Sequence, residues 1–278
     1  MPWAKHIWEK SLPILAERGY IIPAVNTEDV DYVACARALA NSIREWHPTA
    51  QVCLLTDKLI EDSTFTHIKT LPYGDQALEQ SWKLSNDWQV FAASPFRQTV
   101  KLEADMLATS PIDHWWTLFE RRDVVISTGC RDFYGNPSAS RFYRRVFDVN
   151  NLPDVYNAIT YWRMSTGAKE FFQWVRRIFT NWQQFKTLLK FADDQPTTDL
   201  VYAVAAQIFG VHQCTLPQGL GPSMVHMKKH IVPIRGQDWT KELIWEHTNP
   251  GLRINTVAQQ GLFHYHVKNW LTNESRNH

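Results

Sequence analysis

The stretch that decides the fold is Thr99-Val100-Lys101-Leu102-Glu103-Ala104-Asp105-Met106-Leu107. Its β-branched and apolar start predicts a buried strand, bounded by Pro95 upstream and by Ser110-Pro111 downstream. Glu103 and Asp105 follow at the carboxyl end of that strand, the end that faces the ligand crevice in an open α/β sheet. One residue apart on an extended chain, the two carboxylates project to the same side, where they can share a divalent cation or divide their contacts between a metal and a sugar hydroxyl. The alternative is a solvated acidic turn, because acid-x-acid is a common pattern.

Length and composition fit one large α/β domain or two small ones, and we favour one. The chain has 278 residues and 44% apolar content, enough to bury a sizeable core. Its 29 Lys and Arg residues nearly balance its 28 Asp and Glu residues, so net charge indicates no partner. Four scattered cysteines without a C-x-x-C pair favour buried thiols in a reducing compartment. Without a signal-like start or an apolar run of about 18 residues, we expect a cytoplasmic protein with no membrane span.

The first half of the domain predicts a βαβ unit with parallel strands. Residues 20–25 and 52–57 form apolar runs, and a helix with an apolar stripe ending at Trp46 lies between them. Pro23 would place the first strand at a sheet edge, unless the N–H position that it lacks faces out of the ladder. Asn26 or Thr27 is expected to cap the helix, ahead of an acidic first turn.

The rest of the chain continues the mixed pattern and divides into three parts. We expect a helical lead-in over 1–19, the domain over 20–270 and a frayed tail over 271–278. Within the domain, the further elements are strands near 67–69, at 99–102 and at 123–127, and helices over 82–91, 112–119, 171–189 and 198–209.

Four features in a fixed order resemble the glycogenin-like, GT-A fold, nucleotide-sugar glycosyltransferases. They are the βαβ unit, the strand ending in Glu103-Ala104-Asp105, the segment Tyr156-Asn157-Ala158-Ile159 before a long helix, and Asp194-Gln195 before another helix. A fifth is the late segment Phe263-His264-Tyr265-His266-Val267-Lys268-Asn269-Trp270. The resemblance spans roughly residues 20–270. Within the family, the chain resembles a divergent, virus-type member. It implies a single GT-A-like domain with a mainly parallel central sheet flanked by helices.

The resemblance also implies site residues. Asp105 and His264 or His266 would bind Mn²⁺ or Mg²⁺, and the choice between the histidines stays open. Glu103 stands where the family more often has Asp. Asp194, Gln195 and Asn157 would be the catalytic set around the donor sugar, and the remaining donor-binding residues would be Asn26, Lys268 and Trp270. Compared with the family pattern H-x-x-G-x-x-K-P-W, the chain lacks the Gly, has Asn269 for the Pro and a shorter spacing from His to Lys.

The implied activity is that of a retaining hexosyl- or pentosyltransferase acting on a nucleotide-sugar donor, a UDP-sugar above all. The diphosphate leaving group calls for a hard cation with oxygen ligands and a cationic side chain nearby. Two rival classes stay open. One is a metal-dependent nuclease or nucleotidyltransferase, although Asn26-Thr27-Glu28-Asp29 is acidic and glycine-free where a pyrophosphorylase would have a phosphate loop. The other is a noncatalytic protein that binds sugar or nucleic acid.

The acceptor would be a hydroxyl on a saccharide, a protein or DNA. Residues 141–190 contain nine basic and three acidic side chains, and Arg141-Phe142-Tyr143-Arg144-Arg145 sets arginines among aromatic rings. With Arg163, Arg176 and Arg177, this segment suits phosphate contact and base stacking, which makes a hydroxylated base in DNA a candidate acceptor. The alternative is that these arginines solvate one face of a long helix.

Overall fold

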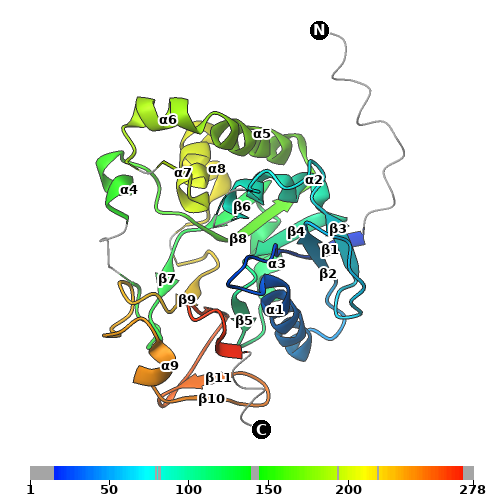
Figure 1. Ribbon diagram of the computed structural model, residues 1–278, viewed down its shortest axis with the longest axis vertical. Coiled ribbons are helices and arrows are strands. Elements are labelled where there is room, and N and C mark those ends of the chain that lie inside the picture. The colour runs from blue at the N-terminus through cyan, green and yellow to red at the C-terminus, as the bar shows by residue number, and fades with distance from the viewer. Residues whose placement is uncertain are drawn as a thin grey trace.

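The core of the protein is a six-stranded sheet in the order β3-β2-β1-β4-β8-β6 (Figure 1). Its strands are β1 (Ala16–Pro23), β2 (Val52–Thr56), β3 (His67–Thr70), β4 (Phe96–Leu102), β6 (Val124–Ser127) and β8 (Tyr156–Arg163). The first four in the sequence pair in parallel, and β8 runs antiparallel to both β4 and β6. The predicted mainly parallel sheet is therefore confirmed in this computed structural model, with β4 near its middle.

Helices cover both faces of the sheet. Since side chains alternate between the two faces along each strand, the apolar strands contribute to one core on each face. Ile22 and Leu54 pack with the apolar stripe of α1 (Tyr32–Trp46) on one face. Ile21 and Leu55 belong to the second core, with α5 (Thr166–Thr180) and α7 (Thr198–Phe209). Figure 1 shows α5 and α7 grouped on the opposite side of the sheet from α1.

A second, four-stranded sheet continues directly from the first. It has the order β5-β13-β9-β7, with β5 (Met106–Ala108), β7 (Cys130–Arg131), β9 (Met224–His226) and β13 (Leu262–His264). Because β4 ends at Leu102 and β5 begins at Met106, Glu103 and Asp105 lie at the joint between the two sheets. The chain segment that decides the fold thus also places the acidic pair.

Shorter elements complete the chain. They are η2 (Lys83–Gln89, a 3-10 helix), α2 (Val90–Ala93), α3 (His114–Phe119), α4 (Arg145–Val149), α6 (Trp182–Leu189), α8 (Val211–Cys214), α9 (Trp239–Glu242), and the antiparallel strands β10 (Trp245–His247), β11 (Leu252–Ile254) and β12 (Val257–Ala258). The single helix expected over 171–189 is two helices, because Asn181 leaves helical geometry with φ −120° and ψ 32°. All four cysteines are buried and free, as predicted.

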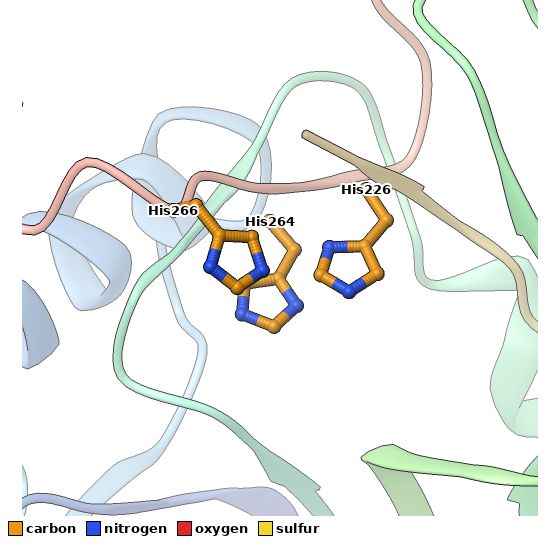
Figure 2. Close-up of side chains that lie close together, drawn as sticks. All are labelled: His226, His264 and His266. Atoms are coloured by element: carbon orange, nitrogen blue, oxygen red, sulfur yellow. The ribbon is translucent and has the colours of Figure 1, made fainter. Parts of the chain in front are cut away.

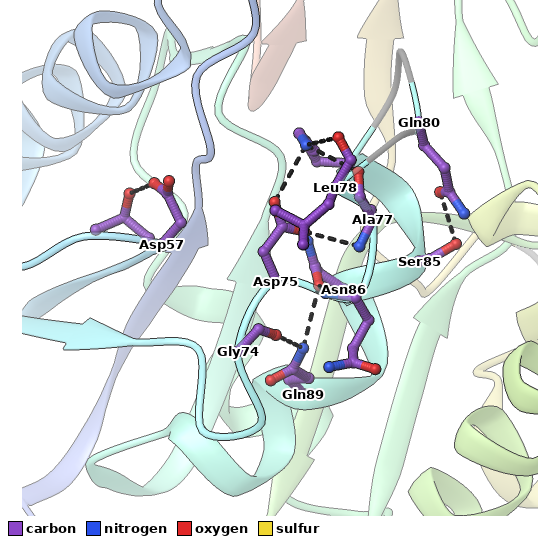
Figure 3. A network of polar contacts seen from close by, with 12 residues as sticks. Asp57, Gly74, Asp75, Ala77, Leu78, Gln80, Ser85, Asn86 and Gln89 are labelled. Carbon is purple, nitrogen blue, oxygen red and sulfur yellow. Dashed lines mark hydrogen bonds and ion pairs between the residues drawn. The ribbon is translucent and has the colours of Figure 1, made fainter.

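A polar network ties the loop of residues 73–80 to η2 (Figure 3). The Lys83 ammonium donates to the Asp75 carboxylate at 3.1 Å and to the Ala77 carbonyl at 2.8 Å. The Asn86 amide donates to Asp75 at 2.7 Å, and the Gln89 amide donates to the Gly74 carbonyl at 2.9 Å. These contacts fix η2, which carries Asp87 toward the strands below the acidic pair.

The structure describes residues 16–78, 80, 83–138, 144–192, 194–217 and 219–271. The lead-in helix expected over 1–19 lies mostly outside these residues, and residues 16–19 belong to strand β1 instead. The tail expected over 271–278 lies outside them beyond Leu271. In the described part, no helix is long and apolar enough to span a membrane.

The internal position of β1 follows the exception left open for Pro23, whereas the predicted cap of α1 was wrong. The strand is internal, between β2 and β4, because Pro23 is its last residue and leaves the ladder before it intact. The cap of α1 is Asp31, whose carboxylate accepts from the Ala34 N–H at 3.0 Å, while the Asn26 side chain accepts from the Val33 N–H at 2.9 Å. Residues 26–30 therefore form a loop before the helix instead of its first turn.

Candidate metal and donor site

The acidic pair is held by backbone hydrogen bonds on both sides. The Glu103 N–H donates to the Ala158 carbonyl at 3.2 Å, and the Tyr265 N–H donates to the Asp105 carbonyl at 3.2 Å. The first bond anchors the segment to β8 and the second anchors it to the residue after β13. The Asp105 side chain is 6% exposed and that of Glu103 is 26% exposed, so the pair is not a solvated turn.

One imidazole contacts both carboxylates. The His264 Nε2 lies 3.1 Å from the Asp105 Oδ2 and 3.4 Å from the Glu103 Oε2. One ligand atom from each of the three side chains lies within 4.8 Å of the other two. The Lys268 ammonium forms an ion pair with Asp105 as well. Of the two histidines left open by the sequence, His264 is the one that contacts the carboxylates.

This donor set fits a divalent cation. Carboxylate oxygens suit Mg²⁺ and Mn²⁺, and imidazole nitrogen is a common additional ligand for transition metals. Burial lowers the pKa of His264, against the opposing effect of Glu103 and Asp199, which favours the neutral ring that a metal requires. Burial also lowers the pKa of Lys268, and its pairing with Asp105 supplies the positive charge that the buried carboxylate needs.

Asn157 is a positioning residue beneath the site. Its side chain is fully buried and bonded at both ends: the amide donates to Asp87 at 3.1 Å, and the oxygen accepts from Thr160 at 2.9 Å. Asp87 also accepts from the Tyr202 hydroxyl at 2.6 Å and pairs with Lys101 at 2.8 Å. The resemblance implied a direct catalytic contact for Asn157, and in the structure each polar atom of its side chain already has one protein partner.

Asp194 and Gln195 do not join the cluster. Both are exposed, and Asp194, with a 91% exposed side chain, forms an ion pair with Lys186 of α6. The nearby carboxylate is that of Asp199, in the first turn of α7, which accepts from the Asn157 N–H at 2.8 Å. Asp199 was not predicted as a site residue, because an acidic side chain in the first turn of a helix is commonly explained by its favourable interaction with the helix dipole.

Lys268 connects the acidic pair to a cleft. The cleft has a volume of about 490 Å³ and is lined by residues 29–31, 237–238 and 266–269. Asn26 is exposed just ahead of the first of these segments. Trp270 is 3% exposed and packs edge to face against Trp239 at 4.9 Å between ring centroids, so it supports the segment that carries Lys268 and does not line the cleft itself, contrary to the donor-binding role expected of it.

Arg144 is also structural, which corrects its expected role in phosphate contact. It is 1% exposed, pairs with Asp199 at 2.9 Å and with Asp154 at 2.5 Å, and lies over the rings of Phe147 and Tyr156. Of the other arginines in the segment predicted to bind DNA, Arg141 lies outside the described residues. Arg163 pairs with Asp123, and Arg176 and Arg177 lie over tryptophan rings.

Two histidines beside the site make stability depend on pH. Burial lowers the pKa of His226 well below its usual range and that of His266 to about 3. Below about pH 6.5 these two imidazoles are protonated in the unfolded chain but stay neutral in the folded chain, so the unfolded chain binds more protons. We expect the free energy of unfolding to fall as pH drops from 6.5 toward 4, by about 1.4 kcal/mol per pH unit for each histidine.

The measurement is urea unfolding between pH 8 and pH 4.5 for the wild type and for His226→Phe. The variant should lose less stability across this range, whereas exchange of the exposed His212 for Asn should leave the pH slope unchanged. An equal slope in wild type and His226→Phe would contradict the assignment.

Solved structures show a similar architecture. The galactosyltransferase LgtC, in complex with donor and acceptor sugar analogs, aligns at a TM-score of 0.51 and 11% identity, over 89% of this chain and 87% of that one. An active-site mutant of LgtC aligns at 0.52 and 13% identity with the same coverage. Mouse xyloside xylosyltransferase 1 aligns at 0.49 and 8% identity, over 91% and 98% of the two chains. The sequence itself matches no family model and no curated protein. On the two LgtC alignments, the chain has the GT-A type of α/β fold.

Proposed function

We propose that this protein is a metal-dependent glycosyltransferase that moves a sugar from a nucleotide-sugar donor to an acceptor hydroxyl. The observation that carries the proposal is the convergence of Glu103, Asp105 and His264 at the end of β4 in a GT-A fold. Lys268 stands beside them as the cationic side chain. Two carboxylates, one neutral imidazole and one ammonium are the groups that binding and release of a diphosphate require.

Mn²⁺ or Mg²⁺ is the cation that this ligand set favours. When bound, it would neutralise charge on the diphosphate as the bond to the sugar breaks. Asp105 and His264 hold it in this proposal, with Glu103 as the third ligand. Lys268 then exchanges its ion pair with Asp105 for the donor phosphates, so the same side chain balances charge both before and after binding.

The cleft next to Lys268 is the proposed place of the nucleoside. Its walls come from the loop before α1 and from the segment after β13, so a diphosphate at Lys268 would have its nucleoside in the cleft. Asn26 belongs to the same loop but does not line the cleft, and its side chain accepts from the Val33 N–H at 2.9 Å, so its contribution to donor binding would be to hold the loop. A UDP-sugar is the expected donor.

Retention is the outcome that the resemblance to the family implies, and the environment of Asp199 argues against a double displacement through that carboxylate. One of its oxygens accepts from the Asn157 N–H and the other pairs with Arg144, so neither is free to attack the anomeric carbon. A route in which the leaving phosphate assists the acceptor hydroxyl needs no such nucleophile. We expect NMR of the first product formed to show the anomeric configuration of the donor. An inverted product would refute retention.

The activity is tested by incubating the protein with a panel of sugar nucleotides, with and without EDTA. We expect slow hydrolysis of one donor that EDTA stops and Mn²⁺ restores. Cleavage between the phosphates, or of nucleic acid, would indicate a nucleotidyltransferase or nuclease. Binding of a sugar nucleotide without any metal-dependent turnover would indicate a noncatalytic protein.

We propose that the acceptor is a hydroxyl on a saccharide or a protein. The case for DNA depended on a basic track with accessible arginines, and Arg144 is buried in ion pairs. The acceptor class can be tested by transfer of labelled sugar to saccharides, to protein and to hydroxymethylated DNA at low ionic strength.

A further inference from the structure

Three histidines form a stacked cluster next to the acidic pair, and His264 belongs both to this cluster and to the proposed metal site. His226 and His264 end the neighbouring parallel strands β9 and β13 and are register partners, so their side chains lie on the same side of the small sheet. Their ring centroids are 4.5 Å apart with planes at 4°. His266 stacks on His226 at 4.9 Å and on His264 at 5.4 Å. Figure 2 shows the three rings grouped together.

Each ring has a buried nitrogen without a hydrogen-bond partner. These atoms are the Nδ1 of His226, the Nδ1 of His264 and the Nε2 of His266. His226 and His264 are 5% and 6% exposed, so bulk water does not satisfy them. Because an unsatisfied buried polar atom is costly, three in one cluster indicate a missing partner.

We propose that His226, His264 and His266 form a second metal site, selective for a borderline transition ion such as Zn²⁺. Imidazole suits Zn²⁺, Ni²⁺ and Cu²⁺, whereas carboxylate suits Mg²⁺ and Mn²⁺. His264 belongs to both ligand sets, through Nε2 toward the carboxylates and through Nδ1 toward the other two histidines. A neutral imidazole carries a proton on one nitrogen and offers a lone pair only on the other, so His264 can bind one of the two ions at a time. Zn²⁺ in the three-histidine site therefore weakens the hard-ion site, which makes it an inhibitory ion for any activity that depends on Mn²⁺.

The three rings would have to change their orientation to bind one Zn²⁺ ion. One nitrogen from each ring lies within 4.8 Å of the others. Tetrahedral Zn²⁺ with Zn–N bonds of about 2.0–2.1 Å places its ligands roughly 3.4 Å apart. The rings are nearly parallel, so they must rotate about their Cβ–Cγ bonds to converge. The small sheet holds the backbones of His226 and His264 in register while the rings turn.

Zn²⁺ binding is measured by isothermal titration calorimetry on metal-free protein, without Mn²⁺ or sugar nucleotide. The variants are His226→Phe and His266→Phe, which keep an aromatic ring in the stack but remove its nitrogens. We expect one Zn²⁺ per wild-type chain and at least a tenfold loss of affinity in each variant. His212→Asn, which changes an exposed histidine outside the cluster, should bind Zn²⁺ as the wild type does.

A parallel titration follows Mn²⁺ by electron paramagnetic resonance. Mn²⁺ affinity should stay within about twofold of wild type in His226→Phe. Zn²⁺ should displace Mn²⁺ from the wild type at least tenfold more effectively than from that variant, in which Zn²⁺ can compete only directly for the carboxylate site. Equal Zn²⁺ affinity in the wild type and both Phe variants, or no Zn²⁺ binding by folded wild-type protein, would overturn the proposal and identify the cluster as ring stacking alone. Because calorimetry needs no turnover, this result is independent of the glycosyltransferase assignment.

Discussion

Asp105→Ala is expected to lower metal-dependent turnover by about a thousandfold, which corresponds to about 4 kcal/mol at 1.36 kcal/mol per factor of ten. Asp105 is the most buried carboxylate of the proposed metal site, contacts His264 at 3.1 Å and pairs with Lys268. Its loss removes a metal ligand and leaves the ammonium of Lys268 without its partner. The measurement is donor hydrolysis at saturating Mn²⁺, together with Mn²⁺ affinity by electron paramagnetic resonance.

Two further variants separate the chemistry from folding. Asp105→Asn keeps the size of the side chain, so it should retain the fold and still lose most of the Mn²⁺ affinity. Asp123→Asn removes a carboxylate that pairs with Arg163 outside the site and should keep the wild-type rate. Wild-type turnover by folded Asp105→Ala would end the metal-site proposal.

Arg144→Ala should destabilise the protein by about 3–5 kcal/mol, because removal of one partner of a buried ion pair leaves the other charge uncompensated. Arg144 is 1% exposed and holds Asp199 and Asp154. It also lies over the rings of Phe147 and Tyr156, at 3.9 and 4.1 Å from their centroids. For a chain of this size the loss lowers the melting temperature by about 10 °C. Thermal unfolding followed by circular dichroism measures it.

The neighbouring residue provides a matched control. Arg145 is exposed at the start of α4, and Arg145→Ala should change the free energy of unfolding by no more than about 0.5 kcal/mol. If both variants melt as the wild type does, the buried ion pairs of Arg144 do not stabilise the protein. If Arg144→Ala instead reduces DNA affinity without loss of stability, the basic-track hypothesis regains its support.

The parts of the fold that the sequence predicted are those set by local pattern. The strand at 99–102, the helix ending at Trp46 and the strand at 52–57 were predicted correctly because apolar periodicity and breakers mark them directly. Both carboxylates contact His264 as a shared site requires, but residues 104 and 105 form a bend between β4 and β5, so this convergence is not the two-residue period of an extended chain on which the prediction was based.

The parts that the sequence did not predict depend on contacts between distant residues. Arg144 was interpreted as part of a cationic surface, because no local pattern shows that Asp154 and Asp199 reach it in the folded chain. Asp194 was selected because Asp194-Gln195 matches a two-residue pattern of the family, and Asp199, which accepts from the backbone N–H of Asn157, was not considered. The pairing of His226 with His264 needs the register of β9 and β13, which the sequence alone does not give.

The joint between the two sheets has a consequence for folding. Asp105 and His264 are 159 positions apart, and His264 reaches Asp105 only when β13 has paired with β5 and β9. Contacts of such long separation form late, since closing the intervening chain costs entropy before any contact repays it. An intermediate with only the six-stranded sheet would carry Asp105 without the imidazole or ammonium that compensates its charge. Acquisition of Mn²⁺ affinity during refolding should therefore lag behind the recovery of secondary structure, and it would report the last step in the assembly of this chain.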